Sequence, residues 1–278
     1  MQRPQDVSDA IATLPSGLHV GKYSDLSLNS AFQPIYGLAA DGLQLVAYEG
    51  LIRPRRAGQP VSPGELFANI DAPDRLFVES MCRVLHLRNF LQAVPIAEFL
   101  FINIDPSTYA SIDVVEREFA LMFSMLHKYG LSPQMLVCEV IETEALSETA
   151  MQRLWDMLRS HGAQLAIDDF GAGRSGIDRY RSMQPDVVKV DGDLFRDMAT
   201  DPRRIKMLRT MLRTFREDSA TVLVEGIETA EQLDIAHHVG ATLFQGYYLG
   251  KPQILPAGFA LNLPLAQASF DAPRVKSL

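Results

Sequence analysis

The chain has 278 residues, enough for one large barrel of roughly 250 residues or for two ordinary domains. Its formal net charge of −8 argues against binding to a DNA or RNA polymer, since contacts with a phosphate backbone usually require an excess of basic residues. The sequence contains only two cysteines, Cys82 and Cys138, so a disulfide framework is excluded and we expect two reduced, buried thiols.

The first 27 residues contain no apolar run of the length found in signal peptides. No uninterrupted apolar stretch elsewhere approaches the length of a membrane span. We therefore expect a cytoplasmic protein that does not span a membrane. We expect residues 1–27 to form an N-terminal extension, residues 28–262 a barrel domain and residues 263–278 a C-terminal tail. Both end segments should pack outside the barrel or fray.

Eight segments rich in β-branched and aromatic residues predict strands. In chain order they are residues 31–37, 43–52, 99–105, 136–141, 164–170, 187–190, 221–227 and 242–249. Between most of these segments, apolar residues recur at spacings of three and four. This spacing predicts amphipathic helices over residues 76–91, 114–126, 149–158 and 205–215.

The order of these elements predicts the topology. Alternating strands and helices favour parallel strands joined by right-handed crossovers, and eight strands favour closure over an open sheet. The first two strands break this rule, because a short turn containing Asp41-Gly42 joins them as a hairpin. We therefore expect an α/β fold, a modified TIM-type (β/α)8 barrel with one antiparallel strand.

Six of the predicted strands end in an acidic, amide or ammonium side chain. These residues are Glu49, Asn103, Glu139, the pair Asp168-Asp169, Lys189 and Glu225. A single acidic residue at such a junction is ordinarily a helix cap, but this many strand ends are hard to explain by capping. In a barrel the strand ends converge on one mouth, where crowded carboxylates need cations. Oxygen ligands with one amide suit Mg²⁺ or Mn²⁺ better than zinc.

Eight ordered motifs between about residues 32 and 252 carry a family resemblance. They are Phe32-Gln33-Pro34-Ile35, Tyr48-Glu49-Gly50-Leu51-Ile52-Arg53, Asn103-Ile104-Asp105, Glu139-Val140-Ile141-Glu142, Asp168-Asp169-Phe170-Gly171, Lys189-Val190-Asp191, Glu225-Gly226-Ile227-Glu228-Thr229 and Gln245-Gly246-Tyr247-Tyr248. In this order they resemble the EAL domain of bacterial cyclic di-GMP phosphodiesterases. The resemblance implies a hydrolase that cuts cyclic di-GMP to linear pGpG with two divalent cations, Mg²⁺ or Mn²⁺, in the mouth of the barrel.

The resemblance also implies a role for each matched residue. One cation would be held by Glu49, Asn103, Glu139 and Asp168, and the other by Asp168, Asp169 and Glu225. Catalytic roles fall to Lys189, beside the attacking water, to Glu225, and to Glu142, which would anchor the loop after Asp169. The nucleotide or the metal-bound waters would be surrounded by Gln33, Leu51, Arg53 and Gln245. The family often dimerises, so we expect a homodimer.

Four positions depart from the family pattern. Gly50 replaces the alanine that names the family, which should loosen the strand without deleting a ligand. Pro54, Arg174 and Asp105 also replace residues that are common in the family, yet none of the changes removes a metal ligand.

Three functions remain open on this basis. The first is an active phosphodiesterase, which the full set of ligand positions favours. The second is a catalytically weak receptor that binds cyclic di-GMP, and the third is a partner-binding scaffold.

Overall fold

The computed structural model describes residues 6–40, 42–93, 99–109, 112–140, 148–171 and 176–256. Eight strands close into a barrel: β3 (Leu26–Ala39), β4 (Gly42–Arg56), β6 (Phe99–Ile104), β7 (Leu136–Val140), β8 (Gln164–Phe170), β9 (Val187–Val190), β10 (Thr221–Val224) and β11 (Leu243–Phe244). Around the ring their order is β3-β11-β10-β9-β8-β7-β6-β4, and β4 pairs back with β3. The predicted closed barrel is confirmed.

One strand of the ring is reversed, as predicted. β3 runs antiparallel to both of its neighbours, β4 and β11, whereas the other neighbouring pairs of the ring are parallel. Ala39 pairs with Gly42, so β3 and β4 form the expected hairpin, although Asp41 itself lies outside the described residues. A connection this short allows only antiparallel pairing, because a parallel pair needs a crossover of a dozen or more residues.

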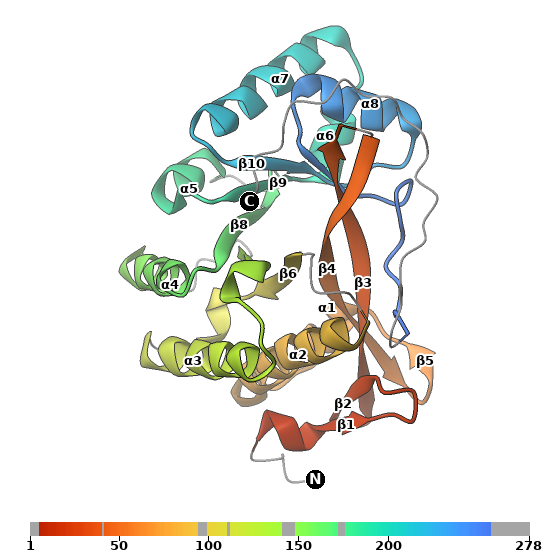
Figure 1. Cartoon of the computed structure of the whole chain (residues 1–278), viewed down its shortest axis with the longest axis vertical. Coiled ribbons are helices and arrows are strands. Elements are labelled where there is room, and N and C mark those ends of the chain that lie inside the picture. Colours follow the sequence, from red (N-terminus) through yellow and green to blue (C-terminus); the bar gives the residue numbers. More distant parts are fainter. Residues whose placement is uncertain are drawn as a thin grey trace.

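The first two barrel strands are longer than predicted. β3 and β4 cross as two long strands that extend beyond the ring (Figure 1), where they pair with β2 (His19–Tyr23) and β5 (Gln59–Pro60). β1 (Ile11–Thr13) pairs in turn with β2. The domain boundary at residue 28 stays a prediction, and the predicted tail 263–278 lies outside the described residues.

Helices surround the barrel. They are α1 (Pro63–Ala68), α2 (Ala72–Ala93), α3 (Ile112–Lys128), α4 (Glu148–Ser160), α5 (Gly176–Met183), α6 (Gly192–Met198), α7 (Pro202–Glu217) and α8 (Ala230–Val239), with short 3₁₀ turns at Val7–Ala10, Pro106–Thr108 and Pro133–Met135. The four predicted helices lie within α2, α3, α4 and α7. The sequence did not predict α1, α5, α6 and α8, each of which has ten residues or fewer.

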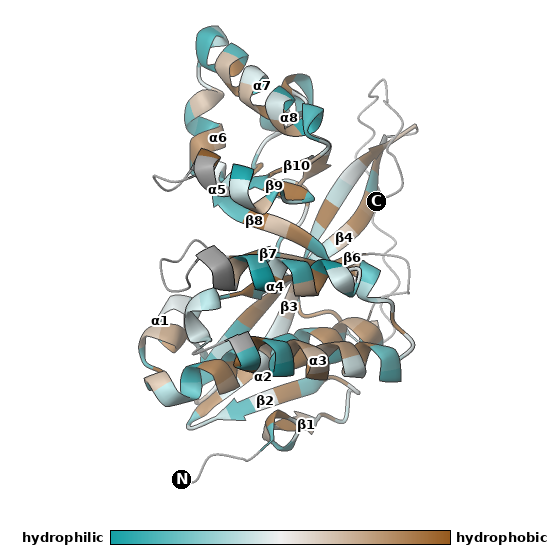
Figure 2. Cartoon of the chain, turned by 90° about the vertical axis from the view of Figure 1, so that its left-hand side faces the viewer, coloured by the Kyte–Doolittle hydropathy of each residue, from teal (hydrophilic) through white to brown (hydrophobic). Residues whose placement is uncertain are grey.

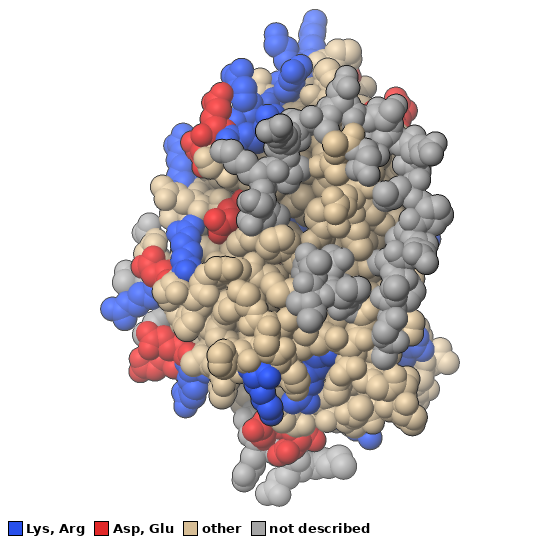
Figure 3. Space-filling model, in the orientation of Figure 1, with Lys and Arg blue, Asp and Glu red and all other residues tan. Residues whose placement is uncertain are grey.

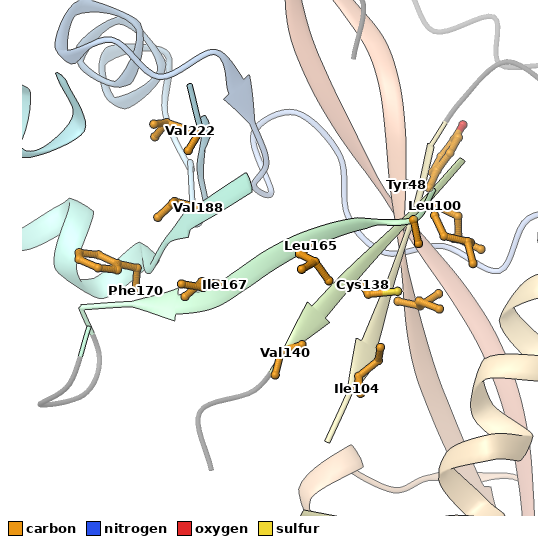
Figure 4. Close-up of a cluster of buried hydrophobic side chains, with 14 of the residues drawn as sticks. Tyr48, Leu100, Ile104, Cys138, Val140, Leu165, Ile167, Phe170, Val188 and Val222 are labelled. Carbon is orange, nitrogen blue, oxygen red and sulfur yellow. The ribbon is translucent and has the colours of Figure 1, made fainter. Parts of the chain in front are cut away.

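The largest apolar core lies between the strands and the helices. Figure 4 shows side chains of this layer on neighbouring strands, among them Cys138 on β7, Leu165 and Ile167 on β8, and Val188 on β9. Hydrophobic residues dominate these strands, whereas the helices alternate between hydrophobic and hydrophilic residues (Figure 2). Both cysteines are buried and free, as predicted.

The outer face of α7 is basic. On the opposite, inner face of α7, Leu208, Leu212 and Phe215 are buried. Its exposed cations are Arg203, Arg204, Lys206, Arg209, Arg213 and Arg216. Lys and Arg side chains gather at this end of the molecule (Figure 3). Among the described residues, no helix has the length and apolar character that crossing a bilayer requires.

Candidate active site

Inside the barrel, an apolar layer lies directly below a polar one. Each strand contributes one buried apolar side chain to the lower layer: Ile35, Ala47, Phe101, Val137, Ala166, Val187, Leu223 and Leu243. Two residues further toward the mouth, each strand or the position just after it carries a polar residue: Gln33, Glu49, Asn103, Glu139, Asp168, Lys189, Glu225 and Gln245. Alternate residues of a strand share one face, so all eight polar residues belong to the same inner layer.

Lys189 lies at the centre of the polar layer. Its ammonium nitrogen is 2.6 Å from Glu139 Oε1, 2.8 Å from Asp168 Oδ1, 3.0 Å from Glu225 Oε1 and 3.7 Å from Glu49 Oε1. Burial disfavours the charged amine, but these carboxylates outweigh burial and hold the pKa of Lys189 well above its usual value. The lysine is therefore protonated and contacts carboxylates from four other strands or strand ends.

Glu139 is the most enclosed of the acidic groups. It is 0% exposed, and burial raises the pKa of its carboxyl group well above the usual range, against the attraction of Lys189. Lys189 is at ion-pair distance, yet neither carboxylate oxygen of Glu139 has a hydrogen-bond partner of regular geometry among the described residues. A buried carboxylate with unused lone pairs is costly, so the site suits a bound cation.

A local distortion of β8 brings two consecutive carboxylates to the mouth. In a regular strand, Asp168 and Asp169 would point to opposite faces. Here the pairing of β8 with β9 shifts register between Ile167 and Phe170, and Asp169 takes a left-handed conformation with φ of 52°. Carboxylate oxygens of Asp168, Asp169 and Glu225 consequently lie within 4.8 Å of one another.

Burial also shifts the titration of this acidic group. It raises the pKa of Glu225 to about 8 against the opposing charge of Lys189, and it raises the pKa of Asp169, with a further contribution from Asp168. Three close carboxylate oxygens are hard ligands of the kind that Mg²⁺ and Mn²⁺ prefer. The second predicted ligand set therefore fits a divalent cation as well.

Two buried amides complete the polar layer. Gln245 donates a hydrogen bond from Nε2 to Glu49 Oε2 over 2.8 Å, and Gln33 donates to the carbonyl oxygen of Gly250 over 3.2 Å. Asn103 lies opposite Glu139 in the pairing of β6 with β7. Gln245, which directly follows β11, thus orients the carboxylate of Glu49 on β4, and β3 lies between these two strands.

The remaining predicted residues are placed less centrally. Leu51 and Arg53 follow Glu49 at alternate positions of β4, on the same face and further toward the end of the strand. Arg53 donates from Nη1 to the carbonyl oxygen of Ile52 over 2.9 Å. Glu142 and Arg174 lie outside the described residues.

This arrangement agrees with a family comparison. The family model described as the EAL domain matches residues 24–252. The chain belongs to the EAL domain family.

Named relatives and solved structures resemble the chain over most of its length. It is 29% identical to the cyclic di-GMP phosphodiesterase RocR of Pseudomonas aeruginosa, over 87% of this chain and 62% of that protein. Klebsiella pneumoniae BlrP1, solved in complex with calcium and cyclic di-GMP, superposes with a TM-score of 0.71 at 31% identity and covers 84% of this chain and 57% of its own. A standalone EAL protein of Vibrio cholerae, solved with cyclic di-GMP bound, gives 0.73 at 26% identity, over 83% and 94%.

The curated relatives are longer proteins. The chain spans between 21% and 62% of the lengths of the first three that it matches.

Sequence reasoning missed one residue beside the EAL motif Glu49-Gly50-Leu51. His86 of α2 is buried against the outer face of β4, where it faces Gly50. A lone histidine in an apolar helix is read as a core residue, and no motif marks it. Glycine at position 50, where the family name has alanine, was the only signal in the sequence that something fills this space.

Proposed function

We propose that this EAL domain is a metal-dependent phosphodiesterase that hydrolyses cyclic di-GMP to linear pGpG. The observation that carries the proposal is the inner layer of carboxylates around Lys189, in which the oxygens of buried Glu139 lack regular hydrogen bonds. Relatives named as cyclic di-GMP phosphodiesterases and structures solved with this nucleotide support the choice of substrate.

Two ligand sets would hold divalent cations, Mg²⁺ or Mn²⁺. The first set is Glu49, Asn103, Glu139 and Asp168, and the second is Asp168, Asp169 and Glu225. Two cations bound together supply charge neutralisation at the phosphodiester and a bound water of lowered pKa. Asp168 belongs to both sets, so this carboxylate would fix the position of one cation relative to the other.

The remaining polar residues would orient the reactants. Lys189 can donate a hydrogen bond to the attacking water and hold negative charge near it, because its ammonium stays protonated. Arg53 can pair with phosphate oxygens through its planar guanidinium group. We assign Gln33, Leu51 and Gln245 to the surroundings of the nucleotide, and Gln245 also to the orientation of Glu49.

Three further expectations belong to the same proposal. Glu142 would anchor the loop after Asp169, the protein would form a homodimer, and it would act in the cytoplasm. Light scattering during size-exclusion chromatography tests the expected homodimer, which should have twice the mass of the 30.9 kDa chain.

The direct test is chemical. Purified protein is incubated with cyclic di-GMP and Mn²⁺ or Mg²⁺, and the products are separated by chromatography. Linear pGpG should form with either metal and should not form in EDTA. Nucleotide binding in EDTA without turnover in either metal would instead indicate a receptor, and neither binding nor turnover would indicate a scaffold.

Metal affinity should depend on pH through Glu225. Its pKa of about 8 means that the carboxyl group holds a proton below that pH in the metal-free protein, and a cation must displace this proton. Displacement of this proton should therefore make the Mn²⁺ affinity, measured by calorimetry, rise by up to about tenfold per pH unit between pH 6 and pH 8. Glu225→Gln should flatten this slope, and an affinity independent of pH in the wild type would refute the assignment.

Gln245→Leu should weaken the metal site without removing a ligand. The change leaves Glu49 Oε2 without its donor, so the carboxylate can rotate away from the cation. Loss of such a supporting contact typically costs about 10- to 100-fold in metal affinity. The Mn²⁺ concentration for half-maximal activity should rise accordingly. Gln152→Leu removes a similar amide–carboxylate bond on the surface of α4 and should have no effect; equal behaviour of the two variants would contradict the role of Gln245.

A further inference from the structure

The outer face of the β3–β4 hairpin forms a niche that one imidazole ring fills. The ring of His86 lies there, only 5% exposed, with Nδ1 3.0 Å from Ser30 Oγ and with the ring of Phe32 edge-on at 6.4 Å between centroids. Burial, followed by the charge of Arg53, lowers the pKa of His86 to about 3, so the ring is neutral. Gly50, paired with Phe32 across the hairpin, closes the niche.

A side chain at position 50 would collide with this ring. A Cβ atom built on Gly50 would lie 2.9 Å from His86 Cγ, 3.1 Å from His86 Cβ and 3.3 Å from His86 Cδ2. Carbon atoms pack at about 3.5–4.0 Å, so the strand and the helix would have to separate by about half an ångström. Rotation of the ring about χ2 does not relieve the collision, because the two closest atoms, Cγ and Cβ, do not move in it.

The helix is held in place while the strand carries the site. Three residues beyond His86, Asn89 exchanges two hydrogen bonds with the backbone of His19, at 2.7 and 2.9 Å, which ties α2 to β2. On β4, Glu49 directly precedes Gly50 and points into the barrel toward Gln245 and Lys189. A side chain that displaced Gly50 on the outer face of β4 would therefore also displace Glu49 on the inner face.

We propose that the chain carries glycine at the centre of the Glu49-Gly50-Leu51 motif because His86 occupies the space that a side chain at position 50 would need, and that such a side chain would push β4 away from α2 and displace Glu49. The inference rests on the proposed metal-dependent function, because it concerns the place of a metal ligand. It reverses the expectation that glycine merely loosens the strand: here alanine, the residue that names the family, would be harmful.

The test is a set of four variants: Gly50→Ala, His86→Ala, the two combined, and Gly64→Ala. Gly64 on α1 is the matched control, because a Cβ atom built there meets nothing within 4 Å. Each variant is characterised by its melting temperature, by its Mn²⁺ dissociation constant from calorimetry and by kcat and KM for cyclic di-GMP.

Gly50→Ala should lower kcat about tenfold, since a misplacement of 1 Å can cost about a hundredfold, and should weaken Mn²⁺ binding by a similar factor. KM should change much less than kcat. His86→Ala should mainly lower the melting temperature and leave Mn²⁺ binding near that of the wild type. The combined variant should regain most of the lost metal affinity and turnover, because only the tight contact between two Cβ atoms remains. Gly64→Ala should match the wild type.

Two results would overturn the inference. One is Gly50→Ala behaving like Gly64→Ala, and the other is a combined variant as defective as Gly50→Ala alone. If Gly50→Ala fails to fold, the combined variant decides: a folded protein that binds Mn²⁺ supports the inference, and an unfolded one refutes it. A wild type that neither binds Mn²⁺ nor cuts cyclic di-GMP would refute the proposed function instead, so the two failures are distinguishable.

Discussion

Asp168→Asn is expected to lower kcat for cyclic di-GMP by at least roughly 10²–10³-fold, the loss that follows removal of a single electrostatic stabiliser from an active site. Asp168 belongs to both proposed ligand sets, and its Oδ1 atom also pairs with Lys189 and accepts the backbone N–H of Asp169. The amide keeps the shape of the side chain and removes its charge. Steady-state formation of pGpG measures the effect.

The same variant should remain folded, because the change is at the mouth and removes no core packing. Its melting temperature in EDTA should lie close to that of the wild type. Asp156→Asn on the exposed face of α4 removes a carboxylate outside the inner layer and should leave turnover unchanged. A folded Asp168→Asn protein with near wild-type turnover would show that this carboxylate is not a metal ligand.

Lys189→Met should have the largest effect on stability. Of the described cationic side chains, only Lys189 lies within ion-pair distance of Glu49, Glu139, Asp168 and Glu225. Its loss leaves buried carboxylates without a counter-charge, and breaking such a buried pair costs about 3–5 kcal/mol. In EDTA the melting temperature should fall by about 10 °C for a domain of this size.

Mn²⁺ should partly replace the missing ammonium. Its addition should therefore raise the melting temperature of Lys189→Met more than that of the wild type. Turnover should fall far more than nucleotide binding weakens, since the lysine acts on the attacking water. Lys206→Met on the exposed face of α7 is the control. Equal losses in kcat and in nucleotide affinity would show that Lys189 binds the substrate and does not act in catalysis. An unchanged melting temperature would contradict its role as the counter-charge of the carboxylates.

Much of the site follows from the sequence because strands obey a period of two. Once a strand such as residues 187–190 is recognised, the position of Lys189 two residues beyond buried Val187 places its side chain inside the barrel. The closed barrel then brings together residues as distant as Glu49 and Gln245. Strand ends were therefore enough to predict six of the eight inner positions, whereas Gln33 and Gln245 were predicted only through the family resemblance.

Features that depend on local backbone conformation were harder to predict. The predicted strand 221–227 ends in the structure at Val224, and Gly226 two residues later has φ of 66°. The clustering of Asp168 with Asp169 depends on a register shift in β8, which a regular strand pattern does not show. The short helix α8 begins with a capping box of Thr229 and Gln232, a signal that was present in the sequence but not used.

Contacts between distant elements could not be read from the sequence at all. His86 and Gly50 are 36 positions apart, and neither belongs to a pattern that would pair them. Their contact depends on how α2 lies across the hairpin of β3 and β4, which only the folded structure shows. Packing of this kind decides which residue fits beside a metal ligand.

Anomalous diffraction of Mn²⁺ in crystals of the protein grown with the metal would locate the cations directly. Two peaks are expected in the barrel mouth, one beside Glu49, Asn103, Glu139 and Asp168 and the other beside Asp168, Asp169 and Glu225. Lys189 should then lie further from at least one of the carboxylates that it contacts in the present structure. Full occupancy of Mn²⁺ elsewhere, with the inner layer unchanged around Lys189, would contradict a two-metal site in the barrel mouth.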